Sequence, residues 1–278
     1  MRPPLRHSAG LAAVLLGLAA LPGCAPSQTA AAAERDGSRR CPSAWLGAQI
    51  PAGTNVELLV AAGPTIPAGR WRAYRAMATA VAGCAAPGTA VTLRAITDRS
   101  LTELPLFTGT IPAEPGQNAV NPLRYRTELL GFAAREAAAV DRLPAVGTAA
   151  TGSDPLGALA AAGQDQSVAR AGSKHVVVAI FNGWQQTRAL NLFSYQHDPA
   201  GSTVGTVRAL RTSGALPDLG GSDVVIVGLT AGATTMQTSD AQLAGLCRFW
   251  HDVVAASGGK LTLCAAALPG IDDSGSHV

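Results

Sequence analysis

Two segments of this chain are apolar without interruption over the length of a β-strand. They lie within KHVVVAIF at residues 174–181 and DVVIVGLT at residues 223–230, after the polar residues that begin each stretch. A strand with one face in water alternates apolar and polar residues, whereas a strand covered on both faces does not. These two segments therefore predict a parallel sheet with helices on both of its faces.

The rest of the chain alternates strand and helix patterns that suit such a sheet. Further strands are predicted at 56–61, 89–97, 101–110 and 260–268, and helices at 69–83, 121–143, 153 to about 170, and 239–257. Asn121-Pro122 and Ser153-Asp154-Pro155 are typical helix starts, with a capping side chain before a proline. This order predicts an α/β fold with an open, doubly wound, mostly parallel sheet flanked by helices.

The N-terminal segment has the pattern of an export signal. Arg2 and Arg6 precede the apolar stretch 11–21, which is too short for a bilayer span of about 20 residues. The stretch ends in Leu-Pro-Gly-Cys24, which resembles the lipobox of bacterial lipoproteins. That resemblance implies a signal peptide over residues 1–23 and lipidation of Cys24. The alternative is an ordinary secreted protein cleaved within residues 29–33.

The remaining sequence divides into three parts. Residues 24–45 contain small and charged residues without apolar periodicity and are expected to form a flexible tether. Residues 46–268 form the α/β domain, and residues 269–278 a polar tail. A lipid anchor would hold the domain on the extracytoplasmic face of the cell membrane.

Cysteine usage agrees with that compartment. Apart from Cys24, the chain has Cys41, Cys84, Cys247 and Cys264, and an even number in an exported protein predicts two disulfides. Of the three connectivities, the layout favours Cys247 with Cys264, because a consecutive helix and strand carry them. Cys84 ends a helix expected on the opposite side of the sheet, so it is assigned to Cys41. Unpaired buried thiols are the alternative.

Composition and motifs exclude several classes of function. Hydrophobic residues make up 47% of the chain, which excludes general disorder. The net charge is +3 and the basic residues are scattered, which argues against a nucleic-acid partner. The sequence contains no GxSxG, Walker, HExxH or GxGxxG motif, so no catalytic residue is assigned.

Ligands of doubly wound sheets bind beyond the carboxyl ends of the strands. Three predicted loops lie there, at 62–67, 151–155 and 182–186. Their order and placement over residues 54–268 resemble a von Willebrand factor A-type domain. In that family an Asp-x-Ser-x-Ser motif, a Thr and an Asp on these loops hold a metal ion.

The resemblance transfers this site to Ala61, Gly63, Thr65, Ser153 and Asn182, with Asp154 beside them. Mg²⁺ normally takes one or two carboxylates, but Ala61 offers no ligand atom and Asn182 brings no charge. We therefore expect neither a metal nor another cofactor. Asp154 also suits a helix cap.

The strand that ends at residue 181 is followed by Trp184, Gln185 and Gln186. An indole and two amides at the carboxyl end of a strand could form a recognition edge. The alternative is that the tryptophan packs on its neighbours.

Together these features predict a membrane-anchored, extracytoplasmic lipoprotein. Its degenerate A-type domain is expected to bind an unidentified protein or envelope ligand without catalysis. One alternative is a small-molecule (solute) binding lipoprotein that uses the same crevice. A cell-envelope enzyme is a further alternative, although Ser153, Asp154 and His175 lack a supporting motif.

Overall fold

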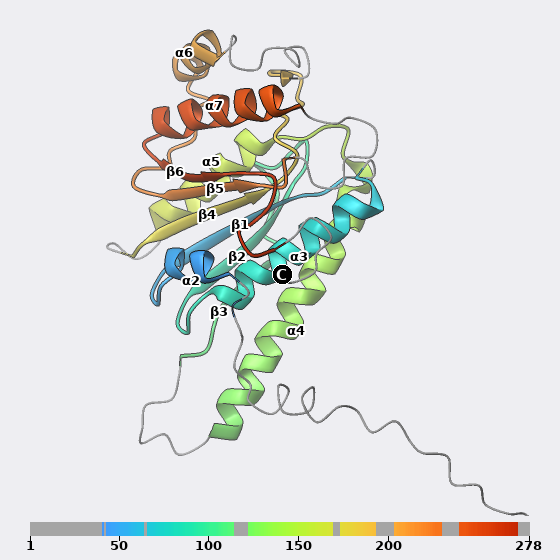
Figure 1. The fold of residues 1–278 in the computed structure, drawn as a ribbon, viewed down its shortest axis with the longest axis vertical. Coiled ribbons are helices and arrows are strands. Elements are labelled where there is room, and N and C mark those ends of the chain that lie inside the picture. The colour runs from blue at the N-terminus through green and yellow to red at the C-terminus, as the bar shows by residue number, and fades with distance from the viewer. Residues whose placement is uncertain are drawn as a thin grey trace, which may run out of the picture. The chain divides into compact units, whose positions relative to one another are not determined.

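A central sheet organises the domain in the computed structural model (Figure 1). The model describes residues 41, 43–63, 66–113, 122–168, 173–192, 203–229 and 239–271. Within these residues the six strands follow the order β3-β2-β1-β4-β5-β6. They are β1 (Asn55–Ala61), β2 (Ala90–Ile96), β3 (Phe107–Thr110), β4 (His175–Ile180), β5 (Asp223–Val227) and β6 (Lys260–Cys264). Only β3, at one edge, is antiparallel to its neighbour.

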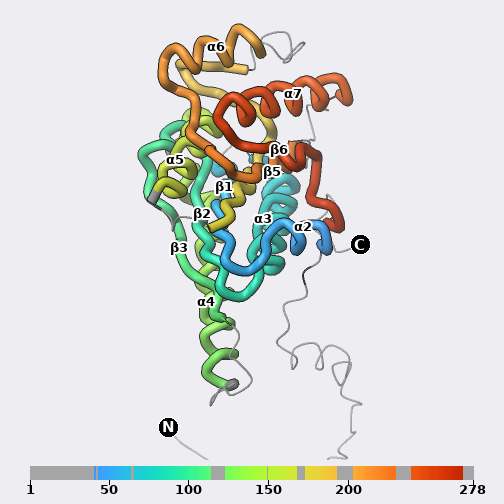
Figure 2. The backbone as a smooth tube through the Cα atoms, turned by 90° about the vertical axis from the view of Figure 1, so that its left-hand side faces the viewer, coloured from blue at the N-terminus to red at the C-terminus, as the bar shows by residue number. Residues whose placement is uncertain are grey.

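Helices cover both faces of this sheet (Figure 2). The helical elements are α2 (Ala44–Gln49), α3 (Ala68–Cys84), α4 (Pro122–Val146), the 3-10 turn η1 (Gly147–Ala149), α5 (Pro155–Val168), α6 (Thr203–Ser213) and α7 (Asp240–Ala256). The core between α2, α3, α4 and the sheet is one apolar cluster, and α5 and α7 form a second on the other face. The outer helix α6 packs on α7. This arrangement confirms the predicted α/β class.

Burial of strand β4 on both of its faces explains why its sequence does not alternate apolar and polar residues. Val176, Val178 and Ile180 enter the cluster on the α3 side. Val177 and Ala179 enter the cluster on the α5 side. All six residues of the strand are buried. Neither face of the strand is therefore exposed to water, so the alternating pattern of a half-exposed strand is not expected.

The chain reverses its direction of travel across the sheet between β1 and β4. From β1 it passes through α3 to β2 on one side, and from β4 it proceeds to β5 and β6 on the other. Val60 pairs with Ile180, so the two central strands end at the same level. Their carboxyl ends form the switch point at which sheets of this type bind ligands.

Both disulfides are those that the sequence favoured. Cys41 is bonded to Cys84 at the end of α3, and Cys247 of α7 is bonded to Cys264 of β6. Each bridge therefore stays on one face of the sheet. The first lies with the α3 cluster and the second with the α7 cluster.

Some predicted boundaries were wrong. The strand expected at 101–110 is confined to residues 107–110, because residues 97–102 form a turn in which the Ser100 hydroxyl donates to the Thr97 carbonyl at 3.0 Å. The strand expected to reach residue 268 ends at Cys264. The sequence did not predict α2 or α6.

Several predictions lie outside the described residues: the signal peptide, Cys24, residues 24–40 of the tether, Thr65, Asn121 and residues 272–278 of the tail. None of the helices within the described part combines the length and apolar character needed to cross a bilayer.

Candidate functional site

Three loops are bonded together at the carboxyl edge of the sheet. Ser153, before α5, and Gln186, after β4, exchange backbone hydrogen bonds of 3.0 and 2.7 Å. The loop after β2 joins them, because the Asp154 amide donates to the Thr97 carbonyl at 2.6 Å. Thr151 donates from its amide and its hydroxyl to Oδ2 of Asp98, at 3.1 and 2.7 Å.

Two of these three loops were predicted, and the loop after β2 was missed. The signal that could have revealed it is the polar run Thr-Asp-Arg-Ser at residues 97–100, directly after an apolar strand. In the sequence analysis residues 98–100 are only the gap between the strands predicted at 89–97 and 101–110.

Asp154 and Gln185 cap the start of α5. Oδ1 of Asp154 accepts from the Gly157 amide at 3.0 Å and from Nε2 of Gln185 at 2.7 Å. Oε1 of Gln185 in turn accepts from the Leu156 amide at 3.1 Å. Two amides of the first turn thus have side-chain partners. The helix-cap interpretation of Asp154 is therefore confirmed.

The predicted recognition edge was wrong for Trp184. Its side chain is 8% exposed and packs into the cluster beneath α5 and α7. The backbone makes this possible, since the Trp184 amide donates to Oδ1 of Asn182 at 3.2 Å and turns the chain inward. Gln185 is also buried, and Gln186 is exposed. The tryptophan packs on its neighbours because burial of its large apolar ring stabilises the fold.

The residues to which the A-type resemblance assigns a metal site do not suit a divalent cation. The Ala61 side chain carries no ligand atom. Oδ1 of Asn182 already accepts a hydrogen bond from the Trp184 amide, and Oδ1 of Asp154 accepts one from the Gly157 amide of α5. Gly147 of η1 lies so close to the end of β1 that a Cβ on it would stand 2.2 Å from the Gly63 nitrogen. Among the residues that the structure describes, no cluster of three or more His, Cys, Asp or Glu could hold a metal ion.

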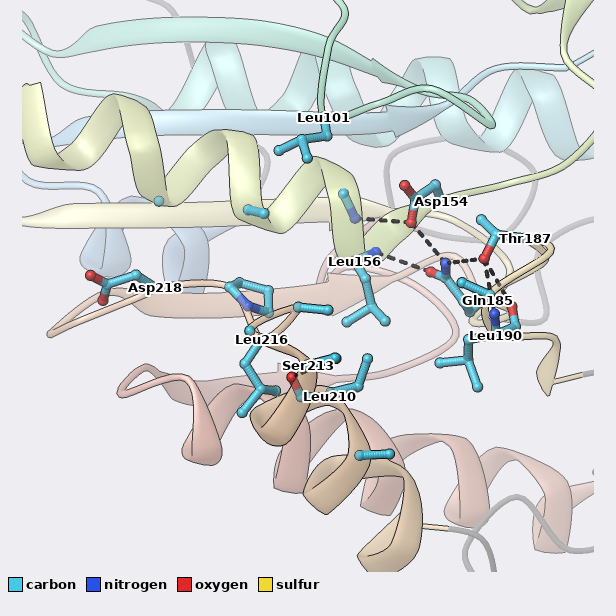
Figure 3. Close-up of a pocket in the computed structure, with 18 of the residues that line it drawn as sticks. Leu101, Asp154, Leu156, Gln185, Thr187, Leu190, Leu210, Ser213, Leu216 and Asp218 are labelled. Atoms are coloured by element: carbon cyan, nitrogen blue, oxygen red, sulfur yellow. Dashed lines mark hydrogen bonds between the residues drawn. The ribbon is translucent and has the colours of Figure 1, made fainter.

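A groove of about 1030 Å³ opens beside the bonded loops, between α5 and α6 (Figure 3). Its size is at the upper end of the range of small-molecule sites. Small residues of α5 line it at Gly157, Ala160 and Gly163. Its larger apolar side chains are Leu101, Leu156, Leu190, Leu210 and Leu216.

Polar groups stand at both ends of this groove. Figure 3 shows Asp154, Gln185 and Thr187 gathered at the start of α5, with Asp218 well away from them. The groove itself was not predicted, because one of its walls is α6. The spacing of Val204, Val207 and Leu210 before Gly214 is the helical signal that could have revealed this wall.

Glycines in α5 allow its close contacts with both ends. A Cβ on Gly157 would stand 2.2 Å from Oδ2 of Asp154, and one on Gly163 would stand 2.0 Å from the Asp218 carbonyl oxygen. Any larger residue would displace the carboxylate or the chain. The groove therefore depends on glycine at these two positions.

A buried charged cluster lies under α5, on the sheet. Arg94 of β2 forms an ion pair with Asp165 of α5, and its Nε stands 3.7 Å from Oε2 of Glu57 on β1. Its Nη1 donates to the Glu103 carbonyl at 2.9 Å. Burial raises the pKa of Glu57 to about 8, and the Asp165 charge adds to this effect, while Arg94 opposes it.

His175 belongs to a neighbouring buried hydrogen-bond chain. Its Nδ1 lies 2.9 Å from the Ser222 hydroxyl, which donates to Oε1 of Gln166 on α5 at 2.6 Å. Burial lowers the pKa of His175, while the Asp165 charge opposes this shift. His175 and Ser222 are 3% and 0% exposed, so no substrate reaches the pair. The chain anchors α5 to β4 and β5.

Comparisons with known proteins add little to this description. No family model matches the sequence, and no curated protein matches it. Among solved structures, the human COPII-coat protein Sec24c is similar at a TM-score of 0.34 and 9% sequence identity. The match covers 80% of this chain and 31% of that protein, so the chain spans about a third of its length.

Proposed function

We propose that this protein is an exported, lipid-anchored binding protein that holds a ligand in the groove between α5 and α6 without acting on it chemically. The observation that carries the proposal is the groove itself. It is large, lined mainly by leucine, alanine and glycine, and situated beside the carboxyl edge of the sheet. Concave apolar sites with a few polar groups are the usual form of a small-molecule site.

Two features support export to an oxidising compartment. The Leu-Pro-Gly-Cys24 sequence follows an apolar stretch of signal-peptide length. The four cysteines of the domain form two disulfides, which persist mainly outside the reducing cytosol. Lipidation of Cys24 would then hold the domain at the extracytoplasmic face of the membrane.

The resemblance to A-type domains supports a binding role but a different site. In that family the ligand meets a metal at the switch point. Here the corresponding positions are Ala61 and Asn182, and neither lines the groove, which is bordered instead by Asp154 and Gln185. A groove of this volume favours a small ligand over a flat protein interface.

Binding without catalysis suits the polar groups in the groove. Gln185 and Asp154 bond to one another and to the amides of α5, and Thr187 bonds to Leu190. Such mutual bonds fix the positions of these groups, which helps orientation of a ligand.

Binding of the neutral apolar dye Nile red tests the proposal. The chain from residue 25 on should bind it saturably, with a rise in fluorescence. Ala160→Phe places a ring in the groove and should abolish the rise. Ala255→Phe, at an exposed position of α7, is the matched control and should bind as the wild type does. If folded Ala160→Phe also binds normally, the groove is not the site.

A further inference from the structure

We infer that the groove binds a cationic amphiphile, with an apolar chain along α5 and an ammonium group beside Asp154. This inference rests on the proposed function and specifies the class of its ligand. Three features of the groove support this ligand class: its apolar lining, the hydrogen-bonded amides of α5, and the position of one carboxylate oxygen.

The lining suits an apolar chain. Gly157, Ala160 and Gly163 lie at intervals of three along α5 and line the groove. Asp154 and the Asp218 backbone lie against the two glycines, so the apolar strip runs past Ala160, between the two ends. Leucines of α6 and of the loops after β2, β4 and α6 stand around this strip (Figure 3). Burying apolar surface here contributes about 25 cal/mol per Å² removed from water.

The start of α5, at the polar end of the groove, does not suit an anion. A helix start usually attracts anions through its free amides. Here the Leu156 amide donates to Gln185 and the Gly157 amide donates to Asp154. Nε2 of Gln185 donates to Asp154 and to the Thr187 hydroxyl, at 2.7 and 3.3 Å. These donors are already used, and the carboxylate would repel a negative head group.

The same end has acceptor capacity for a cation. Both hydrogen bonds described for the Asp154 side chain are to Oδ1. Oδ2 lies over Gly157, where a Cβ would stand 2.2 Å from it, and both residues line the groove. A carboxylate has about four acceptor positions, so Oδ2 can accept from an ammonium group in the groove.

The charged residues around the groove are mostly negative, which suits a cationic ligand. The described residues that line it include three carboxylates, Asp98, Asp154 and Asp218, and one guanidinium, Arg188. Arg99 stands 3.9 Å from Asp98 but is not among those lining residues. Asp98 and Asp218 also accept their hydrogen bonds at one oxygen each, Oδ2 and Oδ1. Asp154 is the carboxylate whose second oxygen lies over Gly157, on the α5 wall of the groove.

The experiment compares three probes with the same chain: octylammonium, octanol and octanoate. The affinity of each probe is measured by its displacement of Nile red from the chain that begins at residue 25. Octylammonium should bind at least about tenfold more tightly than octanoate, because a charge-assisted hydrogen bond contributes about 1.5–3 kcal/mol.

Asp154→Asn removes the charge but keeps a good helix cap. This variant should bind octylammonium about tenfold more weakly than the wild type and should bind octanol equally well. Asp141→Asn removes the same charge from an exposed ion pair on α4 and should change neither probe.

The outcomes separate the inference from the proposed function. If Nile red binds but the three probes bind alike, or octanoate binds best, the inference is wrong and the groove remains the site. The same holds if Asp154→Asn changes octylammonium binding no more than Asp141→Asn does. If neither Nile red nor any probe binds the folded wild type, the proposed function itself fails.

Discussion

Gly147 of η1 lies directly against Gly63 at the end of β1. A Cβ on residue 147 would stand 2.2 Å from the Gly63 nitrogen and 2.5 Å from its Cα. The first metal-binding loop of an A-type domain would begin at this end of β1. Here backbone meets backbone instead, and the residue in place of the first carboxylate is Ala61.

We expect Mg²⁺ to leave the melting temperature unchanged to within about 1 °C. At 1 mM Mg²⁺, a site with a dissociation constant of about 10 μM would stabilise the fold by about 2.7 kcal/mol. For a domain of this size that equals several degrees, at about 2–4 °C per kcal/mol. Thermal melts with Mg²⁺, Mn²⁺ and EDTA measure the shift in melting temperature. A rise of several degrees that EDTA abolishes would contradict the prediction.

A double variant is the positive control for that measurement. Ala61→Asp with Asn182→Asp places carboxylates at the ends of the two neighbouring central strands. Two carboxylates are the number that Mg²⁺ sites commonly use, so this variant should gain a Mg²⁺-dependent rise. If it does not respond, the loops do not converge as in an A-type domain.

Glu57→Gln should make the stability of the protein less sensitive to a rise in pH between 4.5 and about 8. The folded-state pKa of Glu57 is raised from 4.5 to about 8. The unfolded chain therefore releases this proton first, and the stability of the wild type falls as the pH rises between those values. Glutamine does not titrate, so the unfolding free energy of the variant relative to wild type should increase from pH 5 to pH 8.5.

Urea unfolding at several pH values and constant ionic strength measures this difference. The pKa of His175 is lowered, so its contribution is lost as the pH falls below its ordinary value, which is the opposite slope. His175 is present in both proteins and cancels in the comparison. A difference that is constant with pH would contradict the prediction for Glu57.

Removal of either disulfide should destabilise the domain, with the larger effect for the longer loop. The pairs are separated by 43 residues for Cys41–Cys84 and by 17 for Cys247–Cys264. Chain entropy gives about 4 and about 3 kcal/mol for paired replacement by alanine. Urea unfolding of the two double variants measures the losses, and variants as stable as the wild type would contradict this account.

Cys24→Ala should prevent lipidation. In the lipoprotein interpretation this cysteine carries the lipid and becomes the first residue of the mature protein. The variant should remain an uncleaved precursor or appear in the medium, as judged by membrane fractionation and mass. A variant that fractionates with membranes at wild-type size would show that Cys24 is not the anchor.

Local patterns in the sequence determined much of the fold. The uninterrupted apolar runs of β4 and β5 predicted strands buried on both faces, because such runs leave no polar face for water. Asp154 before Pro155 predicted the start of α5. The Cys247–Cys264 pair followed from the order of elements, since a consecutive helix and strand pack together. These features depend on neighbours in the chain.

The site was decided by contacts between distant parts of the chain. Trp184 belongs to the core because α5 and α7 pack around it, and Glu57, Arg94 and Asp165 meet although they lie on three different elements. The groove exists because α6 stands opposite α5. Periodicity reports which face of an element is apolar, but it does not report which other element covers that face. Only the packing of the whole domain supplies that information, and with it the surroundings of Asp154.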